Sequence, residues 1–518
     1  MKEKNIMKKS FSLSASVIRK NRISFCIWLM EILLLFILSA FFVPTVDDLI
    51  FRFSFEYHSV REFLHYVIYY GNGRLLGNAF VLFFSRHTAL FYALQTILFA
   101  VFSVVLEKCV ALPYSRHYVF LYFIFQPLPV WNSTFSWMSS FINYYFPLIL
   151  LAVVLLLLKK YFQAQIKHVN LWLPALFFAG VAMQFFNELN AAVNILVAFL
   201  LCLFFKKRKR KMLAPVLLFV SNLVGFAGTM LFTKCIDFTK TFSYQNAFRQ
   251  DTFSNQNYRQ TIFSVAPGEY VRMLFYNFKF PFFLFSTFIL LYISVLALVL
   301  YVACKKKQYS LKFKTGVAAS VLTYVPPCLF SMIVIHKYPF DLPDQDSKFL
   351  AVMILMILLF CVSCFILAVL FYTVILKHIP HCSLSLISFS VGAVSYLPFL
   401  VVYPGSYRCC ICMLFFFLTA YLIALRDVSK MYGFDLFRLS AFCAAAVSVV
   451  MVLYTCLYAR EKKIYHYRDQ YYMSSVVLPE NNTVIVMGGG SQEPWDEAAG
   501  FTHQFVSFEE FKSVTDLS

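Results

Sequence analysis

The chain is built from a succession of apolar runs that reach or approach the length needed to cross a lipid bilayer. A spanning helix needs about 20 mostly apolar residues to cross a hydrocarbon core about 30 Å thick. Several runs are short for a helix perpendicular to the membrane, so their ends are approximate. They predict an all-α polytopic membrane protein with about 13 transmembrane helices, near residues 23–43, 88–107, 116–130, 145–158, 171–187, 190–205, 212–232, 281–303, 315–335, 349–376, 383–402, 409–425 and 437–457.

Composition excludes a soluble protein. With 61% hydrophobic and only 14% charged residues, the chain has more apolar surface than a soluble fold can bury. The net charge of +20 does not indicate a nucleic-acid partner, because the basic residues cluster in short loops between the apolar runs. The tightest cysteine group, Cys409, Cys410 and Cys412, lacks a second ligand cluster, so we expect ordinary packing there.

Basic residues divide the loops into two sides. With 13 spans they all fall on one side, which the positive-inside rule makes cytoplasmic. We therefore expect a plasma-membrane protein with a cytoplasmic N-terminus (1–22), a transmembrane domain (23–457) and an external C-terminal element (458–518). Two β-branched runs and one helical pattern in this tail predict a small α/β element. The basic positions are 2–22, Lys159, Lys160, 206–211, 305–307, Lys377, Arg426 and Lys430.

The first external loop, residues 44–87, contains a segment that is difficult to place. Residues 73–86 are apolar but too few to span, and a span there would move the basic loop 206–211 to the outside. We interpret this segment as an interfacial or re-entrant helix. A second surface helix is expected over 56–70, where apolar residues recur at helical spacing. Another long external loop covers 233–280.

The unusual polar residues all fall on the external side. Asp47 and Asp48 follow the first span in "PTVDDLIFRF". Ionisable residues near lipid depth are costly and therefore mark function by default. We expect these side chains to converge on one cavity at the outer leaflet, whereas Glu31, within the first span, is assigned no role. The other external candidates are Arg74, Asn143, Tyr144, Asn187, Glu188, Lys337 and Arg408.

Each candidate also has a simpler interpretation. The acidic pair could cap a helix N-terminus, although one aspartate would suffice. Arg74 could be an interfacial anchor whose charge reaches to water. Asn143 and Tyr144 could belong to an aromatic belt at the membrane surface. The remaining four could be a solvated turn, at Asn187 and Glu188, a solvated loop, at Lys337, and the end of a helix, at Arg408.

The order and the sidedness of these residues resemble the GT-C class of membrane glycosyltransferases, and most of all the bacterial families grouped with the GtrII-type glucosyltransferases. Such enzymes tend to have an acidic pair after the first span, a Gly-Arg in the same loop, a Trp…Asn-Tyr segment, a short Asn/Glu turn and a late external Arg. The resemblance covers about the first 200 residues and one later loop, and the Gly expected before Asn-Tyr is absent. The corresponding residues are Asp47–Asp48, Gly73–Arg74, Trp137 with Asn143–Tyr144, Asn187–Glu188 and Arg408.

The resemblance implies a polyprenyl-phosphate-linked sugar donor and an envelope acceptor, which is a glycan, lipid or protein at the outer face. One carboxylate of the pair would take the proton of the acceptor hydroxyl; our hypothesis is that Asp47 is the base and Asp48 supports it. Positive charge would hold the lipid phosphate, either from side chains or from Mg²⁺ or Mn²⁺ bound by the acidic pair, and the sequence leaves both open. The candidate phosphate ligands are Arg74, Arg408 and Lys337. The candidate substrate contacts are Asn143, Tyr144, Asn187 and Glu188.

Two other functions stay open. A secondary transporter predicts broken helices, internal repeats and a polar site at the membrane midplane. No repeat is apparent, and the polar motifs gather at one face. A polymerase or ligase of lipid-linked glycans shares the donor and the topology, so the sequence does not separate it from a transferase of single sugars.

Overall fold

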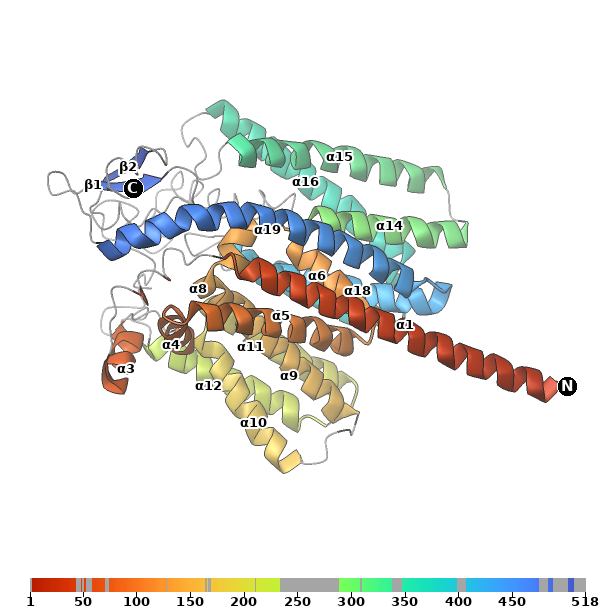
Figure 1. The fold of residues 1–518 in the computed structure, drawn as a ribbon. Coiled ribbons are helices and arrows are strands. Elements are labelled where there is room, and N and C mark those ends of the chain that lie inside the picture. The colour runs from red at the N-terminus through yellow and green to blue at the C-terminus, as the bar shows by residue number, and fades with distance from the viewer. Residues whose placement is uncertain are drawn as a thin grey trace.

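A computed structural model of the chain describes residues 2–42, 48, 51–52, 58–69, 74–126, 128–163, 165, 169–209, 211–232, 288–307, 310–337, 347–397, 407–474, 483–487 and 502–506. Most of the long helices lie side by side along one direction, with the N-terminus at one end and two short strands at the other (Figure 1).

Each of the apolar runs coincides with a helix. Within the described residues, nine helices are long and apolar enough to cross a membrane. The prediction of a helical, multi-pass membrane protein is thereby confirmed. The helices at the thirteen runs are α1 (Lys2–Ser39), α5 (Thr88–Val110), α6 (Ser115–Ile124), α9 (Phe146–Phe162), α10 (Val169–Ala182), α11 (Glu188–Lys207), α12 (Leu213–Phe232), α14 (Ile289–Lys306), α15 (Leu311–Lys337), α16 (Ser347–Val374), α17 (Cys382–Val394), α18 (Ile411–Tyr432) and α19 (Leu436–Ser474).

Four of these helices, α6, α10, α15 and α17, are not among the nine. Three of them have proline inside or just after the helix, where it cannot donate a backbone hydrogen bond. Pro127 follows α6 closely, Pro174 lies inside α10, and Pro326 and Pro327 lie inside α15. α6 has only ten residues and α17 thirteen. The number of spans therefore stays a prediction.

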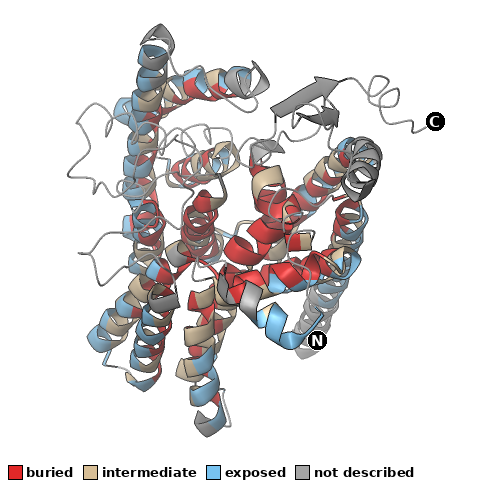
Figure 2. Cartoon of the chain, turned by 90° about the vertical axis from the view of Figure 1, so that its left-hand side faces the viewer, coloured by how far each residue is buried: buried red, intermediate tan, exposed pale blue. Residues whose placement is uncertain are grey.

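The core of the bundle is aromatic and lies around α6 and α18. α6 is buried from Ser115 to Ile124 apart from Arg116, and α18 packs against it. In Figure 2 the buried residues gather in the middle of the bundle, whereas the outlying helices are largely exposed. Exposed residues of α15 and α16 include Leu322 (72%) and Phe365 (71%). Large apolar side chains in such positions are suited to contact with lipid tails.

The two ends of the bundle differ in their chemistry. At one end Arg426 Nη1 donates to the carbonyl of Val110 (2.9 Å), and Lys159 Nζ donates to that of Lys108 (2.6 Å). The side chain of Lys306 likewise caps the end of α16. We call this the basic end; the N-terminus of α1 extends from it (Figure 1). The opposite end, where α19 finishes beside β1, is called the strand end.

The first loop contains two short helices, as predicted. α3 (Val60–Tyr69) and α4 (Leu75–Phe84) have ten residues each, so neither is long enough to span. α4 packs against the segment that precedes α9. The predicted long loop 233–280 lies outside the described residues.

The C-terminal tail is described in part. β1 (Thr483–Met487) falls on one of the predicted β-branched runs and pairs in parallel with β2 (Thr502–Val506), which the sequence did not indicate. α19 continues to Ser474, past residue 458, where we placed the start of the tail. Residues 459–474 contain no proline or glycine, so no helix-breaking residue interrupts them. The predicted helix after Val506 lies outside the described residues.

Candidate functional site

The chain between α6 and α9 is helical but irregular, and it carries most of the candidate site. Two of its elements, η1 and η2, are π-helical, a rare conformation that is frequent at functional sites. Between them Trp137 has an extended backbone (φ −83°, ψ 115°), so a new helical stretch begins at Met138 and continues into α9. The elements are α7 (Leu128–Trp131), η1 (Asn132–Ser136), α8 (Met138–Ser140) and η2 (Phe141–Tyr145).

Asp48 holds the start of this helical stretch. Its Oδ1 accepts a hydrogen bond from the backbone N–H of Ser139 (2.9 Å), and its Oδ2 accepts one from that of Met138 (3.2 Å). Asp48 is fully buried. The first N–H groups of a helix have no partner within the helix and carry partial positive charge, so a carboxylate is stabilising there. Asp48 is therefore a cap, but of a helix that begins 90 residues later in the chain.

Two arginines from distant segments reach the same aromatic residue. Arg408, in η7 (Tyr407–Cys410), places its guanidinium carbon 4.6 Å from the ring centre of Trp137 and 5.6 Å from that of Tyr144. Its Nη1 donates to Ser140 Oγ (3.3 Å). The guanidinium carbon of Arg74, just before α4, lies 5.9 Å from the ring centre of Tyr144. Stacking on the aromatic rings fixes where these two positive charges lie.

An asparagine cluster ties the predicted Asn/Glu turn to the same segment. Asn187 Oδ1 accepts from the backbone N–H groups of Leu189 (2.9 Å) and Asn190 (3.3 Å), so it caps α11. Asn190 Nδ2 lies 3.3 Å from the carbonyl oxygens of both Asn143 and Tyr144. All three asparagines are buried. The start of α11 is therefore joined directly to η2.

Gly77 of α4 allows the first loop to approach η2 closely. A Cβ atom at position 77 would lie 2.0 Å from Asn143 Oδ1 and 3.3 Å from the carbonyl of Phe186. Asn143 cannot swing away cheaply, because its Nδ2 donates to the Ser139 carbonyl (2.8 Å) inside the bundle.

Substituting Gly77 with alanine is therefore expected to destabilise the protein by about 1–3 kcal/mol through overpacking. Thermal unfolding in detergent measures the effect. Gly316→Ala is the matched control, because its added Cβ would meet only Leu370 at an ordinary 3.4 Å and alanine favours the helix. Equal stability of wild type and Gly77→Ala would show that α4 does not pack here as described.

The structure brings together six of the nine predicted site residues: Asp48, Arg74, Asn143, Tyr144, Asn187 and Arg408. Asp47 and Gly73 lie outside the described residues. Glu188 is the first residue of α11 and Lys337 the last of α15, but their side chains are not described. Predictions for these residues stay predictions.

Sequence reasoning missed several members of the cluster. Ser139 and Ser140 lie in the run "WMSSFINYY", and Asn190 ends the turn "FNELN", so their polar character amid apolar residues was the available signal. Cys409 was considered only as packing; its Sγ lies 4.0 Å from the hydroxyl oxygen of Tyr144. Together with Cys410 it packs in a small buried cluster around Tyr144.

The predicted metal site is not tested by these contacts. Among the described residues, no group of three or more His, Cys, Asp or Glu side chains is placed to hold a metal ion. Asp48 uses both oxygens to accept backbone hydrogen bonds. Since Asp47 is not described, binding of Mg²⁺ or Mn²⁺ by the acidic pair stays a prediction.

Comparison of the chain with protein-family models, with curated proteins and with solved structures finds no match.

Proposed function

We propose that the protein is a membrane glycosyltransferase with a GT-C-like bundle, which moves a sugar from a polyprenyl-phosphate-linked donor to an envelope acceptor at the outer face of the plasma membrane. The observation that carries this proposal is the cluster at the strand end. There Arg74 and Arg408 both lie near the ring of Tyr144, and Asp48 holds the helical stretch that contains Tyr144. These residues come from three segments far apart in the chain.

The proposed orientation follows from the two ends of the bundle. The basic end is cytoplasmic by the positive-inside rule, and the strand end with the candidate site is external. About 13 spans, including the short α6 and α17, then connect a cytoplasmic N-terminus to an external C-terminus. A cytoplasmic nucleotide-sugar donor would not reach a site at the strand end, which favours a lipid-linked donor.

Arg74 and Arg408 are the proposed ligands of the donor phosphate. Guanidinium groups form charge-assisted hydrogen bonds with phosphate oxygens, and an arginine fork can bind two oxygens at once. Each arginine lies within about 6 Å of one ring centre. A phosphate held between them would therefore meet positive charge that is already in position. Lys337, the last residue of α15, is the proposed third cation.

The proposed reaction is a single displacement at the anomeric carbon of the donor sugar. The acceptor hydroxyl oxygen forms the new bond to this carbon, and the bond from the carbon to the phosphate oxygen breaks. The proton of the acceptor passes to Asp47, and the lipid phosphate leaves with its charge opposed by the arginines. Asp48 is the supporting residue, since backbone N–H groups engage both of its oxygens.

The asparagines and Glu188 are proposed to border the sugar or acceptor. Asn143 and Tyr144 lie in η2, next to the arginines, and Asn187 with Glu188 begins α11. Amide and carboxylate groups at this point suit hydroxyl-rich ligands, which need both donors and acceptors.

A transfer assay tests the proposal. Purified wild type and an Asp47→Asn/Asp48→Asn double variant would receive a panel of radiolabelled polyprenyl-phosphate sugars and envelope extract, with and without a chelator. We expect label in a new product with wild type only, and the chelator arm reports any metal requirement. Glu62→Gln is the control, because this carboxylate of the same loop is exposed on α3. Absence of transfer from every donor with folded wild type would contradict the proposal.

A transporter is the second candidate, and one observation favours it. α10 ends in a 3₁₀ turn, η3 (Met183–Phe185), where the buried Gln184 donates to Asn222 Oδ1 (3.0 Å) and Asn222 donates to the Asn194 carbonyl (3.0 Å). Buried polar side chains between apolar helices are a feature of transporters. Solute uptake into sealed vesicles that is lost in Gln184→Leu would favour this function. A glycan polymerase or ligase would instead appear in the transfer assay as a product of many sugars.

A further inference from the structure

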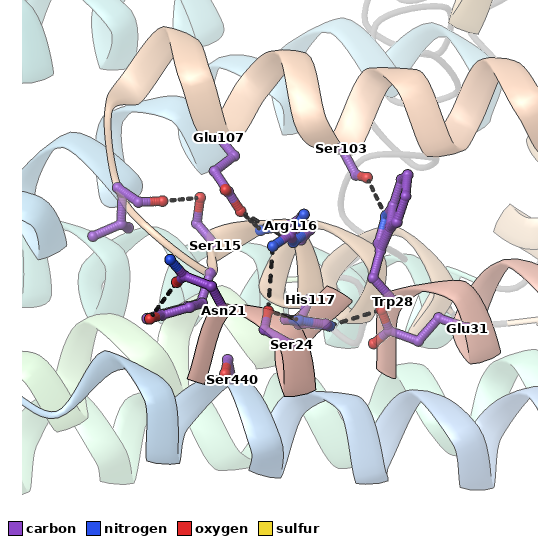
Figure 3. A network of polar contacts seen from close by, with 12 residues as sticks. Asn21, Ser24, Trp28, Glu31, Ser103, Glu107, Ser115, Arg116, His117 and Ser440 are labelled. Atoms are coloured by element: carbon purple, nitrogen blue, oxygen red, sulfur yellow. Dashed lines mark hydrogen bonds and ion pairs between the residues drawn. The ribbon is translucent and has the colours of Figure 1, made fainter. Parts of the chain in front are cut away.

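A second polar network joins side chains of α1, α5 and α6 (Figure 3). It lies toward the basic end of the bundle, near the end of α5 and the start of α6. Glu31 of α1 is fully buried, and its Oε2 lies 2.8 Å from Nδ1 of His117 on α6. The other imidazole nitrogen, Nε2, lies 2.8 Å from Ser24 Oγ, two turns earlier on α1. His117 therefore bridges two positions of α1 with both ring nitrogens.

The network continues to the edge of the bundle through Arg116. Arg116 Nη2 donates to Ser24 Oγ (3.3 Å), and its Nε lies 3.5 Å from Glu107 Oε2 of α5. The side chains of Arg116 and Glu107 are 15% and 18% exposed, whereas those of His117 and Glu31 are 1% and 0% exposed. The partly exposed side chains of Arg116 and Glu107 therefore lie between the His117 imidazole and water at the basic end.

When both carboxylates of this network are ionised, one proton bound by the inner pair balances the charges. Glu31 and Glu107 each carry a negative charge when ionised, and Arg116 carries one positive charge. An uncompensated charge in apolar surroundings is costly. With one additional proton shared by Glu31 and His117, the network becomes neutral.

We propose that the Glu31–His117 pair is a proton-binding site that exchanges with the basic end of the bundle. The bound proton sits on Nε2, which then donates to Ser24 Oγ, while Nδ1–H continues to donate to Glu31 Oε2. It enters or leaves at Nε2 through the Ser24 hydroxyl, which can pass one proton while taking another. The stretch of α1 from 32 to 38, "ILLLFIL", is entirely apolar, so α1 offers no side-chain relay toward the strand end. The inference does not depend on the proposed transferase reaction.

Protonation of the pair would control how firmly α6 is held to α1. With the proton bound, Glu31 and His117 attract; without it, a net negative charge is buried between the helices. The fold should therefore be more stable while the proton is bound, at lower pH, and lose this contribution as pH rises. The other titratable or charged groups facing the pair and α6 are Glu107 of α5, Arg116 of α6, Cys443 of α19, and Tyr118 of α6 stacked on Tyr421 of α18.

Thermal unfolding of the full chain at about pH 6 and about pH 9, on either side of the ordinary histidine range, tests the site. We expect the wild-type melting temperature to fall at the higher pH, and Glu31→Gln and His117→Asn each to remove most of this change. In a double-mutant cycle the two substitutions should be coupled at the lower pH and independent at the higher pH. The surface control is Glu62→Gln, because Glu62 accepts a hydrogen bond from the His58 N–H in full solvent. It should leave the wild-type profile unchanged.

A second measurement needs no variant. Nitrogen-15 histidine spectra of the wild-type protein distinguish an imidazole with two N–H protons from one with a single proton. We expect one solvent-protected histidine signal to change from the doubly to the singly protonated form between the two pH values. A protected signal of unchanged protonation, or unchanged pH dependence of unfolding in both variants, would overturn the proposal. The pair would then be a fixed structural hydrogen bond.

Discussion

Replacing Arg408 with alanine is expected to lower sugar transfer by about 100- to 1,000-fold, the effect typical of removing one fixed donor to developing negative charge. The leaving group of the proposed reaction is a lipid phosphate, and Arg408, its proposed ligand, is positioned by contacts with Trp137, Tyr144 and Ser140. The loss should appear mainly in kcat, because the phosphate gains charge as the bond to the sugar breaks.

Arg408→Lys tests whether transfer requires the positive charge of Arg408 or the planar shape of its guanidinium group. Lysine keeps the positive charge but lacks the planar group that stacks on Trp137 and the fork that binds two oxygens. We expect an intermediate loss of about 10-fold, corresponding to roughly 1.4 kcal/mol. A lysine variant as inactive as the alanine variant would mean that the planar contact, and not the charge, is what transfer requires.

Arg438→Ala is the matched control for these variants. Arg438 lies in α19 near the basic end, its side chain is 88% exposed, and it forms an ion pair with Asp435. Exposed ion pairs contribute little, so transfer and stability should both stay near wild type. Full transfer by folded Arg408→Ala, with unchanged dependence on donor concentration, would contradict the assignment of Arg408 to the phosphate.

The fold was predictable because the membrane restricts the choice of backbone. In lipid every N–H and C=O must find a partner inside the segment, so a long apolar run has to be helical. Each predicted run does coincide with a helix. The number of spans was less accessible, because a helix such as α6, buried on nearly all sides, need not match the thickness of the bilayer.

The membership of the candidate site was predictable for a different reason. Polar residues amid apolar runs are few in this chain, so their order and side of the membrane were enough to group Arg74, Tyr144 and Arg408. The sequence did not indicate how these three side chains contact one another. The π-helical turns η1 and η2 set the direction of Trp137 and Tyr144, and no residue pattern specifies such turns.

The sequence did not indicate which polar residues far apart in the chain contact one another. Glu31 appears alone in the sequence, and its partner His117 lies 86 residues away on another helix. Packing of the whole bundle decides which faces of α1 and α6 are in contact. The spacing of residues within one helix does not carry this information. The same holds for Asp48 and Met138, which lie 90 residues apart.

Asp48→Asn is expected to destabilise the protein by about 1–3 kcal/mol, and transfer should fall with stability. An asparagine can accept through only one oxygen, so its NH₂ group would face one of the two backbone N–H groups at Met138 and Ser139. Neither donor has access to water at this buried position, so the one left over is unsatisfied. Displacement of the helix start would also move Ser140, which contacts Arg408.

Asp47→Asn is expected to behave in the opposite way. If Asp47 is the general base, transfer should fall by about 100- to 10,000-fold while thermal unfolding stays close to wild type. Sugar transfer and thermal unfolding should both be measured for Asp47→Asn and Asp48→Asn. Loss of transfer alone would not distinguish a general base from a helix cap.

Asp435→Asn is the matched control for the cap. Asp435 also caps a helix, but its Oδ1 alone accepts from the N–H groups of both Phe437 (3.1 Å) and Arg438 (3.3 Å) at the start of α19, and the site is in contact with solvent. Asparagine can accept both hydrogen bonds through its one amide oxygen and caps about as well as aspartate, so little change is expected. If instead Asp48→Asn unfolds like wild type yet transfers no sugar, and Asp47→Asn stays active, Asp48 is the base. The cap seen in the structure would then hold that carboxylate in place for catalysis.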